Sequence, residues 1–413
     1  MNDVLKISNF LISQFLKQNL TLIFRGGMKK TVLLFIILLI TIPFSLDATE
    51  TRISALGSEE NLLIDDSNIY SFPSCLERFV ERGIVEYGLY PYADSIAYFS
   101  FLKELGKLGN IGLVFNKKGI PLFPSTSYQT LIAQPYLLIN LYYSRRITGT
   151  LSIGVSGGYG VAASNVDEPG TANDVTNESS VSSGKISLAY FIGEEEHFLE
   201  LSAGAHSYEF TYEQGNNFTF NNDNKISTEF SGRFFYYLND YLSLIPFFTY
   251  STLDLSSKEV AGSITTEIKR ITTTKRAGIG INLMPFQENR IIIGILYNTK
   301  VFEKTSVDYD TTVMDNNIPE IVCGIESELK PWFIVRAGIR KSLLIRKVES
   351  SDGINSVMTE KDTPFKLNVG FGIRFGSLEV DAIINEDLPF TYGYFISGTE
   401  NPVFTKVSAT YLF

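Results

Sequence analysis

The sequence predicts an all-β fold: a transmembrane antiparallel β-barrel with a short N-terminal segment inside it. Three observations predict this class. Apolar and polar residues alternate along many segments, short and long connections alternate between those segments, and the last strand ends on Phe413. We expect 16 strands, with 14 as the alternative.

Composition excludes several other classes. The 413 residues are 44% hydrophobic and 19% charged, so the chain is too apolar for an intrinsically disordered protein. Two cysteines exclude a disulfide framework and a cysteine-based zinc module. A net charge of −10 argues against nucleic acid as a partner. Only one long apolar run is present, near the N-terminus, which excludes a bundle of membrane helices.

Residues 28–48 are typical of a secretory signal peptide. Lys29 and Lys30 form a basic start, residues 31–44 are apolar, and Ala48 supplies a small residue at the end. The alternative is an N-terminal membrane anchor. Residues 1–27 precede this complete signal, so we interpret them as an upstream mis-start and expect translation to begin at Met28. The mature chain then divides into a hatch or plug segment, 49–80, and a barrel, 81–413.

The alternation has a period of two residues. Within 150–161, Leu151, Ile153 and Val155 alternate with Ser152, Gly154 and Ser156. Similar patterns occur within 277–283, 333–340 and 367–375. In a soluble sandwich the apolar face would be the core, whereas in a transmembrane barrel it would contact lipid. Periodicity alone does not separate these two folds.

Connection lengths favour the barrel. Short connections are expected near 145–147, 193–196, 239–241, 287–289, 330–332 and 376–377. Long polar connections are expected near 162–184, 212–225, 255–271, 304–318, 347–364 and 387–402. Tight turns at one end and long loops at the other are typical of outer-membrane barrels.

The expected strands lie near 83–90, 94–102, 109–116, 133–144, 148–161, 185–192, 197–211, 226–238, 241–254, 272–286, 290–303, 319–330, 332–346, 365–375, 378–386 and 403–413. The first two alternate least clearly around Leu89–Tyr92. Because both ends of the barrel must lie on one side of the membrane, these two strands are kept or lost together. Losing them would leave 14 strands.

The C-terminus resembles the assembly signal of outer-membrane barrels. Val407, Ala409, Tyr411 and Phe413 share one face of an alternating last strand. The resemblance implies an outer-membrane location, contact with outer-membrane lipid, and the barrel assembly machinery as a partner acting through Tyr411 and Phe413. The alternative is an ordinary strand that happens to end the chain.

The segment before the barrel also carries a resemblance. Ala55-Leu56-Gly57, Asp65-Asp66 and Pro73 match the N-terminal pattern of the long-chain fatty-acid transporter superfamily, which includes the accessory barrel of the type IX secretion system. Ser58 and Phe72 depart from that pattern. The resemblance implies a hatch folded into a 14-stranded barrel that passes hydrophobic molecules. It makes candidate hatch residues of Gly57, Asp65, Asp66, Asn68 and Pro73.

Alternation also assigns side chains to the lumen. The inward-facing candidates are the acids Glu200, Glu229, Glu326, Glu379 and Asp381, the bases Arg233, Arg336, Arg340, Lys366, Arg374 and Lys406, and His206. Five acids against six bases give no dominant sign, which an ion-selective pore would need. We therefore expect a salt-bridged or plugged interior. These residues either line a route for cargo or hold the barrel together.

Motifs for catalysis or metal binding are weak. A G-x-S-x-G pattern at 154–158 lies within an expected strand, not at a strand–helix turn. His197 beside Glu194–Glu196 and the acidic residues near 308–317 lack further fixed ligands for a metal. We predict no enzyme, no metal and no cofactor. Cys75 falls in the hatch and Cys323 on the lipid face, so we expect no disulfide between them.

Two function classes stay open. One is a transport barrel that passes a small hydrophobic molecule across the outer membrane. The other is a structural or interaction barrel, a surface scaffold or secretion-complex component, without transport of its own. The sequence names no cargo.

Overall fold

The computed structural model describes residues 49–57, 59–88, 97–117, 137–165, 174–193, 197–214, 218–222, 225–286, 288–307, 310–351, 355–384 and 404–413. The strands and helices in these ranges belong to one compact unit, Ser45–Leu412. The expected signal peptide and upstream segment lie outside the described residues. Among the described residues, no helix is long and apolar enough to cross a membrane.

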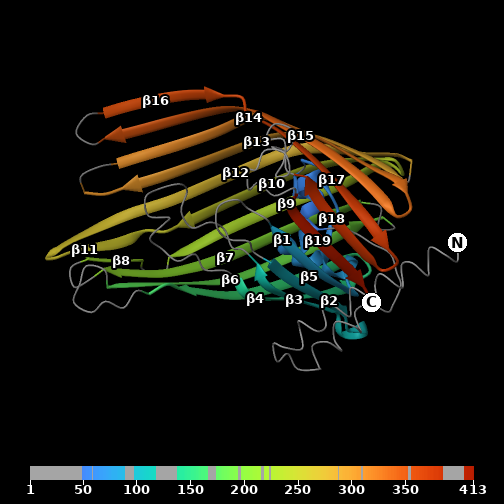
Figure 1. Ribbon diagram of the computed structural model, residues 1–413, viewed down its shortest axis with the longest axis horizontal. Coiled ribbons are helices and arrows are strands. Elements are labelled where there is room, and N and C mark those ends of the chain that lie inside the picture. The colour runs from blue at the N-terminus through green and yellow to red at the C-terminus, as the bar shows by residue number, and fades with distance from the viewer. Residues whose placement is uncertain are drawn as a thin grey trace, which may run out of the picture. The chain divides into compact units, whose positions relative to one another are not determined.

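Sixteen antiparallel strands form a closed barrel (Figure 1). Each strand pairs with its neighbours in the chain, and β1 closes the ring by pairing with β19 as well as β2. The barrel strands are β1 (Arg82–Gly88), β2 (Ala97–Glu104), β3 (Asn110–Lys117), β4 (Leu137–Thr148), β5 (Leu151–Ala163), β6 (Val175–Ile192), β7 (His197–Gln214), β9 (Ile226–Asn239), β10 (Leu242–Asp254), β12 (Ile264–Phe286), β13 (Asn289–Thr305), β14 (Asp310–Lys330), β15 (Phe333–Ser351), β17 (Phe365–Phe375), β18 (Leu378–Ile384) and β19 (Phe404–Leu412). The prediction of 16 strands is confirmed, and the alternative of 14 is wrong.

Three further strands extend one end of the barrel. They are β8 (Phe218–Asn222), β11 (Ser257–Ala261) and β16 (Asn355–Asp362). β8 pairs with β7 and β11, β11 also pairs with β12, and β16 pairs with β15. Figure 1 shows all three at the same end, which we call the loop end. We call the opposite end, where short turns join the strands, the turn end.

These extensions correct the prediction of long polar loops. Val175–Ser183 continues β6 and pairs with β7, and Ile264–Ile271 continues β12. Both stretches were expected to lie in loops because their side chains are polar. Polar residues can continue a strand, however, because the ladder hydrogen bonds are made by the backbone.

One short connection lies later than predicted. The turn expected at 145–147 falls at 149–150, because Arg145 and Arg146 pair with Ile153 and Ser152 in the β4–β5 ladder. The turn at Gly376–Ser377 is confirmed, and it places Arg374 opposite Glu379.

The outer face of the barrel is apolar. On β6, Ile186 and Leu188 are 53% and 41% exposed, whereas their neighbour Ser187 is 1% exposed. The same alternation places Ile321 and Ile325 outward on β14. Large exposed apolar residues on successive strands form a band that suits lipid, as in a transmembrane barrel.

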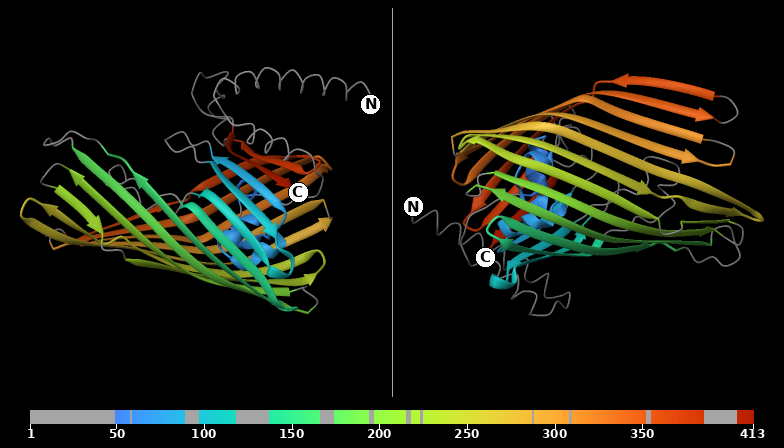
Figure 2. Two further views of the ribbon diagram at one scale, coloured as in Figure 1. Left: turned by 90° about the horizontal axis from the view of Figure 1, so that it is seen from below. Right: turned by 180° about the vertical axis from the view of Figure 1, so that it is seen from behind.

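The N-terminal segment lies inside this barrel (Figures 1 and 2). It contains α3 (Glu50–Ala55), η1 (Glu60–Leu62), η2 (Asp66–Tyr70) and η3 (Pro73–Arg78). We call residues 49–57 and 59–79 the plug. A further short helix, η4 (Gly106–Leu108), connects β2 to β3.

Local chemistry defines the plug helices. The Asp65 side chain accepts from the backbone N–H of Ser67, and Asn68 completes a capping box at the start of η2. Pro73 begins η3, where its missing N–H leaves no donor unsatisfied. Gly57 follows α3 with φ +57°, a conformation that favours glycine.

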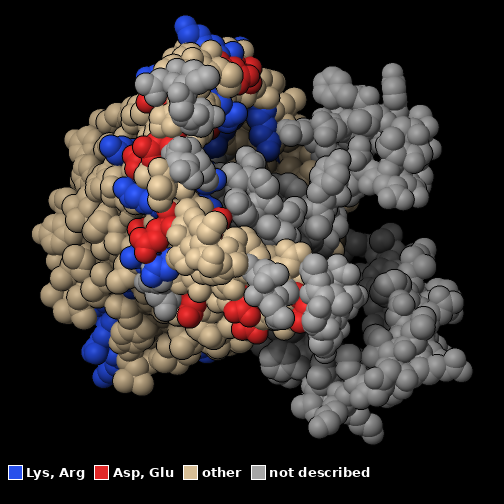
Figure 3. Space-filling model, turned by 90° about the vertical axis from the view of Figure 1, so that its left-hand side faces the viewer, with Lys and Arg blue, Asp and Glu red and all other residues tan. Residues whose placement is uncertain are grey.

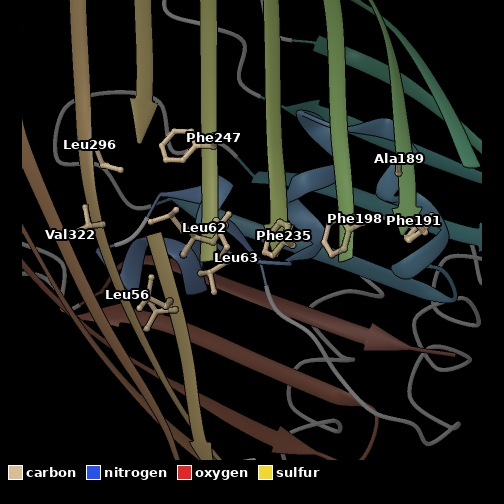
Figure 4. Packing of buried hydrophobic residues seen from close by; sticks show 13 residues of the cluster. Leu56, Leu62, Leu63, Ala189, Phe191, Phe198, Phe235, Phe247, Leu296 and Val322 are labelled. Carbon is tan, nitrogen blue, oxygen red and sulfur yellow. The ribbon is translucent and has the colours of Figure 1, made fainter. Parts of the chain in front are cut away.

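Apolar side chains fill the space between plug and barrel. Leu56, Leu62 and Leu63 are fully buried in a cluster with barrel side chains from β6, β7, β9, β10, β13 and β14 (Figure 4). The barrel members of this cluster are Ala189, Phe191, Phe198, Phe235, Ile245, Phe247, Ile292, Leu296 and Val322. We call this set, with Ile53 of the plug, the plug cluster.

Candidate functional site: the plugged lumen

The most deeply buried charges of the barrel hold the centre of the plug. Arg233 on β9 donates from Nε to Glu200 on β7 at 2.6 Å, and both side chains are fully buried. The guanidinium also donates to the backbone carbonyl of Leu63 at 2.9 Å and to the Asn68 amide oxygen at 3.1 Å. The Cys75 thiol donates to the other Glu200 oxygen at 2.6 Å. One barrel ion pair therefore binds three parts of the plug.

A second network of ion pairs joins α3 to β14, β15 and β18. Arg52 of the plug contacts Glu326 on β14 through two hydrogen bonds of 2.7 Å, and Asp65 at 3.1 Å. Glu326 also accepts from Arg336 on β15 at 2.6 Å. Arg336 in turn contacts Asp381 and, at 3.3 Å, Glu379 on β18. Acids and bases alternate through this network, so each buried charge has a partner.

The same network reaches the turn end. Arg374 on β17 donates to Glu379 at 3.0 Å and also contacts Glu328. Arg374 and Glu328 are each about one quarter exposed, so the network passes from the buried interior to the rim.

Glu59 of the plug contacts arginines on β12 and β15. It contacts Arg276 on β12 and lies 3.5 Å from Arg340 on β15. Arg340 also lies 3.3 Å from Glu320 on β14. Glu59 is 2% exposed, so these arginines compensate a buried carboxylate.

Glu50 contacts the wall formed by the first and last strands. Its carboxylate accepts from Lys406 on β19 at 3.0 Å and also contacts Lys117 on β3. Burial raises the pKa of Glu50, but the two lysines lower it more strongly, to about 2. The carboxylate is therefore charged over the whole physiological range.

Glu229 and His206 lie above the plug, towards the loop end. Glu229 contacts Lys185 on β6 and lies 3.5 Å from His206 Nε2. Lys185 also donates to the Tyr70 backbone carbonyl of the plug at 2.7 Å. A cavity of about 90 Å³ opens here, lined by His206 and Glu229 together with Ser227, Ser251, Thr272 and Lys300.

The remaining candidates lie as follows. Asp66 is 3.6 Å from Arg82 at the start of β1. Lys366 is exposed and lies opposite Arg340 in the β15–β17 ladder. Tyr411 lies between Gly83 of β1 and Leu378 of β18, and Phe413 follows the end of β19.

The G-x-S-x-G pattern has a packing explanation. Ser156 lies in the middle of β5, so the strand–helix turn of a nucleophile elbow is absent there. A Cβ atom added to Gly154 would lie 2.1 Å from the Ser74 backbone nitrogen, so only glycine allows the plug this close. His197 Nδ1 accepts from the Tyr237 backbone N–H at 3.2 Å.

No cluster of metal-ligating side chains occurs among the described residues, and Asp308 lies outside them. Cys75 and Cys323 are both free. Cys323 lies on the same strand face as the outward-facing Ile321 and Ile325.

Sequence reasoning missed partners of two kinds. Glu86, Lys185, Arg276 and Glu320 lie on strands and share the parity of inward-facing neighbours, so the alternation could have found them. The plug residues Glu50, Arg52 and Glu59 lie in a segment without a period. No pattern in the sequence indicates where those side chains point.

The fold and the site together define a closed sixteen-stranded antiparallel barrel that holds its own N-terminal segment inside the lumen. No protein-family model matches the chain, and no curated protein matches its sequence. Its fold is similar to that of several solved barrels.

A FadL homologue of Pseudomonas aeruginosa is 12% identical, with a TM-score of 0.45, 90% of this chain covered and 100% of that one. The toluene transporter TbuX of Ralstonia pickettii is 10% identical, with a TM-score of 0.41 and coverage of 89% and 98%. The ferric yersiniabactin uptake receptor FyuA of Yersinia pestis is 8% identical, with a TM-score of 0.36 and coverage of 80% of each chain. What this chain does must be derived from its own residues.

Proposed function

We propose that this chain is an outer-membrane barrel that passes small apolar molecules past its plug. The loop end would face the outside of the cell, and the turn end would face the periplasm. The observation that carries the proposal is a pair of apolar clusters inside the barrel, one at the loop end and one between the plug and the wall.

The first apolar surface lies at the loop end. Six buried apolar and aromatic side chains form a second cluster there: Val181, Tyr208, Phe210, Tyr212, Phe220 and Leu255. We call it the mouth cluster. Figure 3, which views this end, shows acidic and basic side chains side by side on its surface. A mixed-charge surface gives no strong attraction for ions of either sign.

The second apolar surface is the plug cluster. Phe198, Phe235 and Phe247 point into the lumen, where a water-filled pore would carry polar side chains. Leu62 of the plug packs against the glycines at 280 and 294, so its side chain fills a groove in the wall. An apolar molecule can replace such a contact without leaving a charge or hydrogen bond unsatisfied.

The contacts of the plug indicate which part of it could move most easily. The plug is held by charge at Glu50, Arg52 and Glu59, and Arg233 also binds the Leu63 carbonyl, whereas the Leu62 side chain makes only apolar contacts. Apolar contacts are not directional, so a shift of the Leu62 side chain costs less than a break in a buried ion pair. The route would therefore follow the Leu62 side of the plug.

Uptake of a hydrophobic dye tests this proposal. Cells carrying the chain should take up N-phenyl-1-naphthylamine several-fold faster than cells without it, while a hydrophilic dye of similar size should show no difference. A disulfide between Leu62→Cys and Gly280→Cys should slow uptake because it ties the Leu62 side of the plug to β12; a Cβ atom added at position 280 would lie 3.1 Å from the Leu62 Cγ atom. A reducing agent should restore the rate.

The matched control is a disulfide within the wall. Thr228→Cys with Thr252→Cys replaces two hydroxyls 3.0 Å apart on β9 and β10 and leaves the plug free. This variant should take up the dye at the normal rate. Equal dye uptake with and without the chain would contradict transport.

One observation favours the interaction barrel as a second candidate. Both faces of β16 are exposed from Ser356 to Asp362, so the β15–β16 hairpin projects without cover from described residues. An uncovered strand edge is a common surface for a partner. Normal dye uptake without the chain, together with a partner lost on deletion of 355–362, would support this candidate.

A further inference from the structure

We propose that the N-terminal end of the plug latches the seam at which the barrel closes. On this inference the plug has a second function: Glu50 holds β1 against β19. The inference does not depend on the passage proposed above, because a barrel that passes nothing would still need to close.

The seam joins strands from opposite ends of the chain. β1 pairs with β19 from Arg82–Leu412 to Gly88–Lys406, and this pairing closes the largest loop of the ring. The entropic cost of closing a loop rises with its length, so this junction costs more to close than a junction between strands that are neighbours in the chain. It therefore gains more than the other junctions from a contact beyond its own ladder.

A carboxylate of the plug joins strands on both sides of that junction. Glu50 accepts from Lys406 on β19 at 3.0 Å and contacts Lys117 on β3. Lys406 also contacts Glu86 on β1, and the Tyr98 hydroxyl on β2 donates to Glu86 at 2.8 Å. Glu50 is therefore connected to four consecutive strands that include both members of the seam: directly to β19 and β3, through Lys406 to β1, and through Lys406 and Glu86 to β2.

Among the described residues, the charges of this group balance only when Glu50 is present. The carboxylates of Glu50 and Glu86 oppose the ammonium groups of Lys117 and Lys406, and Glu86 is 1% exposed. Without Glu50, two ammonium groups share one carboxylate in a low-dielectric space. Lys117 also lies 3.2 Å from the centre of the Tyr70 ring, which attracts it but supplies no full charge.

A second contact continues the latch along β19. The hydroxyl oxygens of Thr49 and Ser408 are 2.5 Å apart, and both residues are buried. Ser408 lies directly opposite Glu86 in the β1–β19 ladder. The first two described residues of the plug therefore meet the seam itself.

Glu59 provides a matched control for this latch. It is also a plug carboxylate in buried ion pairs, but its partners Arg276 and Arg340 lie on β12 and β15, away from the seam. Removing either carboxylate weakens plug docking. Only removal of Glu50 should weaken β1–β19.

A seam disulfide separates these two effects. Val85 lies opposite Ala409, so Val85→Cys with Ala409→Cys links β1 to β19 on the outer face. We would measure the unfolding half-life in urea of the full chain in vesicles, with this disulfide reduced or oxidised. Glu50→Gln should shorten the half-life of the reduced form by about tenfold, as expected when a buried partner charge is lost.

Formation of the seam disulfide should restore the unfolding half-life of Glu50→Gln to within twofold of that of the parent with the same disulfide. Glu59→Gln should unfold faster than the parent in both states, because its loss does not act on the seam. The proposal is overturned if Glu50→Gln unfolds at the parent rate, if oxidation fails to restore it, or if oxidation restores both variants equally.

Discussion

At the scale of single residues, most inward-facing charges of this barrel have a partner on the plug or on a neighbouring strand. Arg233 shows the principle most clearly, since it is fully buried and makes hydrogen bonds to one carboxylate, one amide and a backbone carbonyl. A buried ion pair is favourable only when each of its hydrogen-bonding groups is satisfied. The plug provides part of that satisfaction.

Arg233→Met should therefore destabilise the fold by about 3–5 kcal/mol, because it leaves Glu200 buried without its counter-charge. The free energy of unfolding in urea measures this loss. Combining Arg233→Met with Glu200→Gln should recover part of it, since Glu200 then no longer carries a buried charge.

Arg346 supplies the comparison. It makes two hydrogen bonds to Asp315, at 2.7 and 2.9 Å, but its side chain is 43% exposed. Arg346→Met should cost about 1 kcal/mol or less, because water screens an exposed pair. Equal losses for Arg233→Met and Arg346→Met would contradict the account of the buried network.

At the scale of elements, the sequence predicts the strands far better than the plug. The period of two identifies strands such as β5 and β17, and it assigns Arg336 and Glu379 to the same interior. The strand extensions β8 and β16 escape it: β8 has only five residues within a polar loop, and β16 lacks an apolar face. The plug has neither period nor long helix, so only the structure pairs Arg52 with Glu326.

Glycines in the wall decide where the plug can lie. A Cβ atom added to Gly338 would lie 1.9 Å from the Leu56 carbonyl carbon and 2.3 Å from the Gly57 nitrogen, both backbone atoms. Gly338→Ala should therefore displace α3, at a cost of about 1–3 kcal/mol for overpacking. Trypsin cleavage after Arg52 should become faster, which mass spectrometry of the fragments measures.

Gly184→Ala is the control for that substitution. The nearest atom to a Cβ added at Gly184 is the Ser156 carbonyl oxygen at 4.0 Å, an ordinary contact. This variant should resist trypsin as the parent does. If both variants are cleaved at the same rate, the close packing of plug and wall is not what protects Arg52.

At the scale of the whole molecule, one rule accounts for the barrel and its contents. Alternate residues face outward as an apolar band or inward as charges, glycines and apolar side chains. The inward set is complementary to the plug: arginines meet its carboxylates and carbonyls, and glycines admit its backbone. The barrel and the plug therefore form one interior, and the two native cysteines lie on opposite sides of the wall that separates it from lipid.

Those cysteines allow the most direct test of this arrangement. Cys323 is half-buried on the outward face of β14, whereas Cys75 is buried in the plug against Glu200. Burial and the nearby Glu200 carboxylate both raise the pKa of the Cys75 thiol, which further lowers its reactivity. The chain in lipid vesicles would be treated with a lipid-soluble maleimide, and each cysteine followed by mass spectrometry. We expect modification of Cys323 alone in the folded chain, and of both cysteines after unfolding. Modification of Cys75 in the folded chain at the rate of Cys323 would contradict a barrel plugged by its own N-terminal segment.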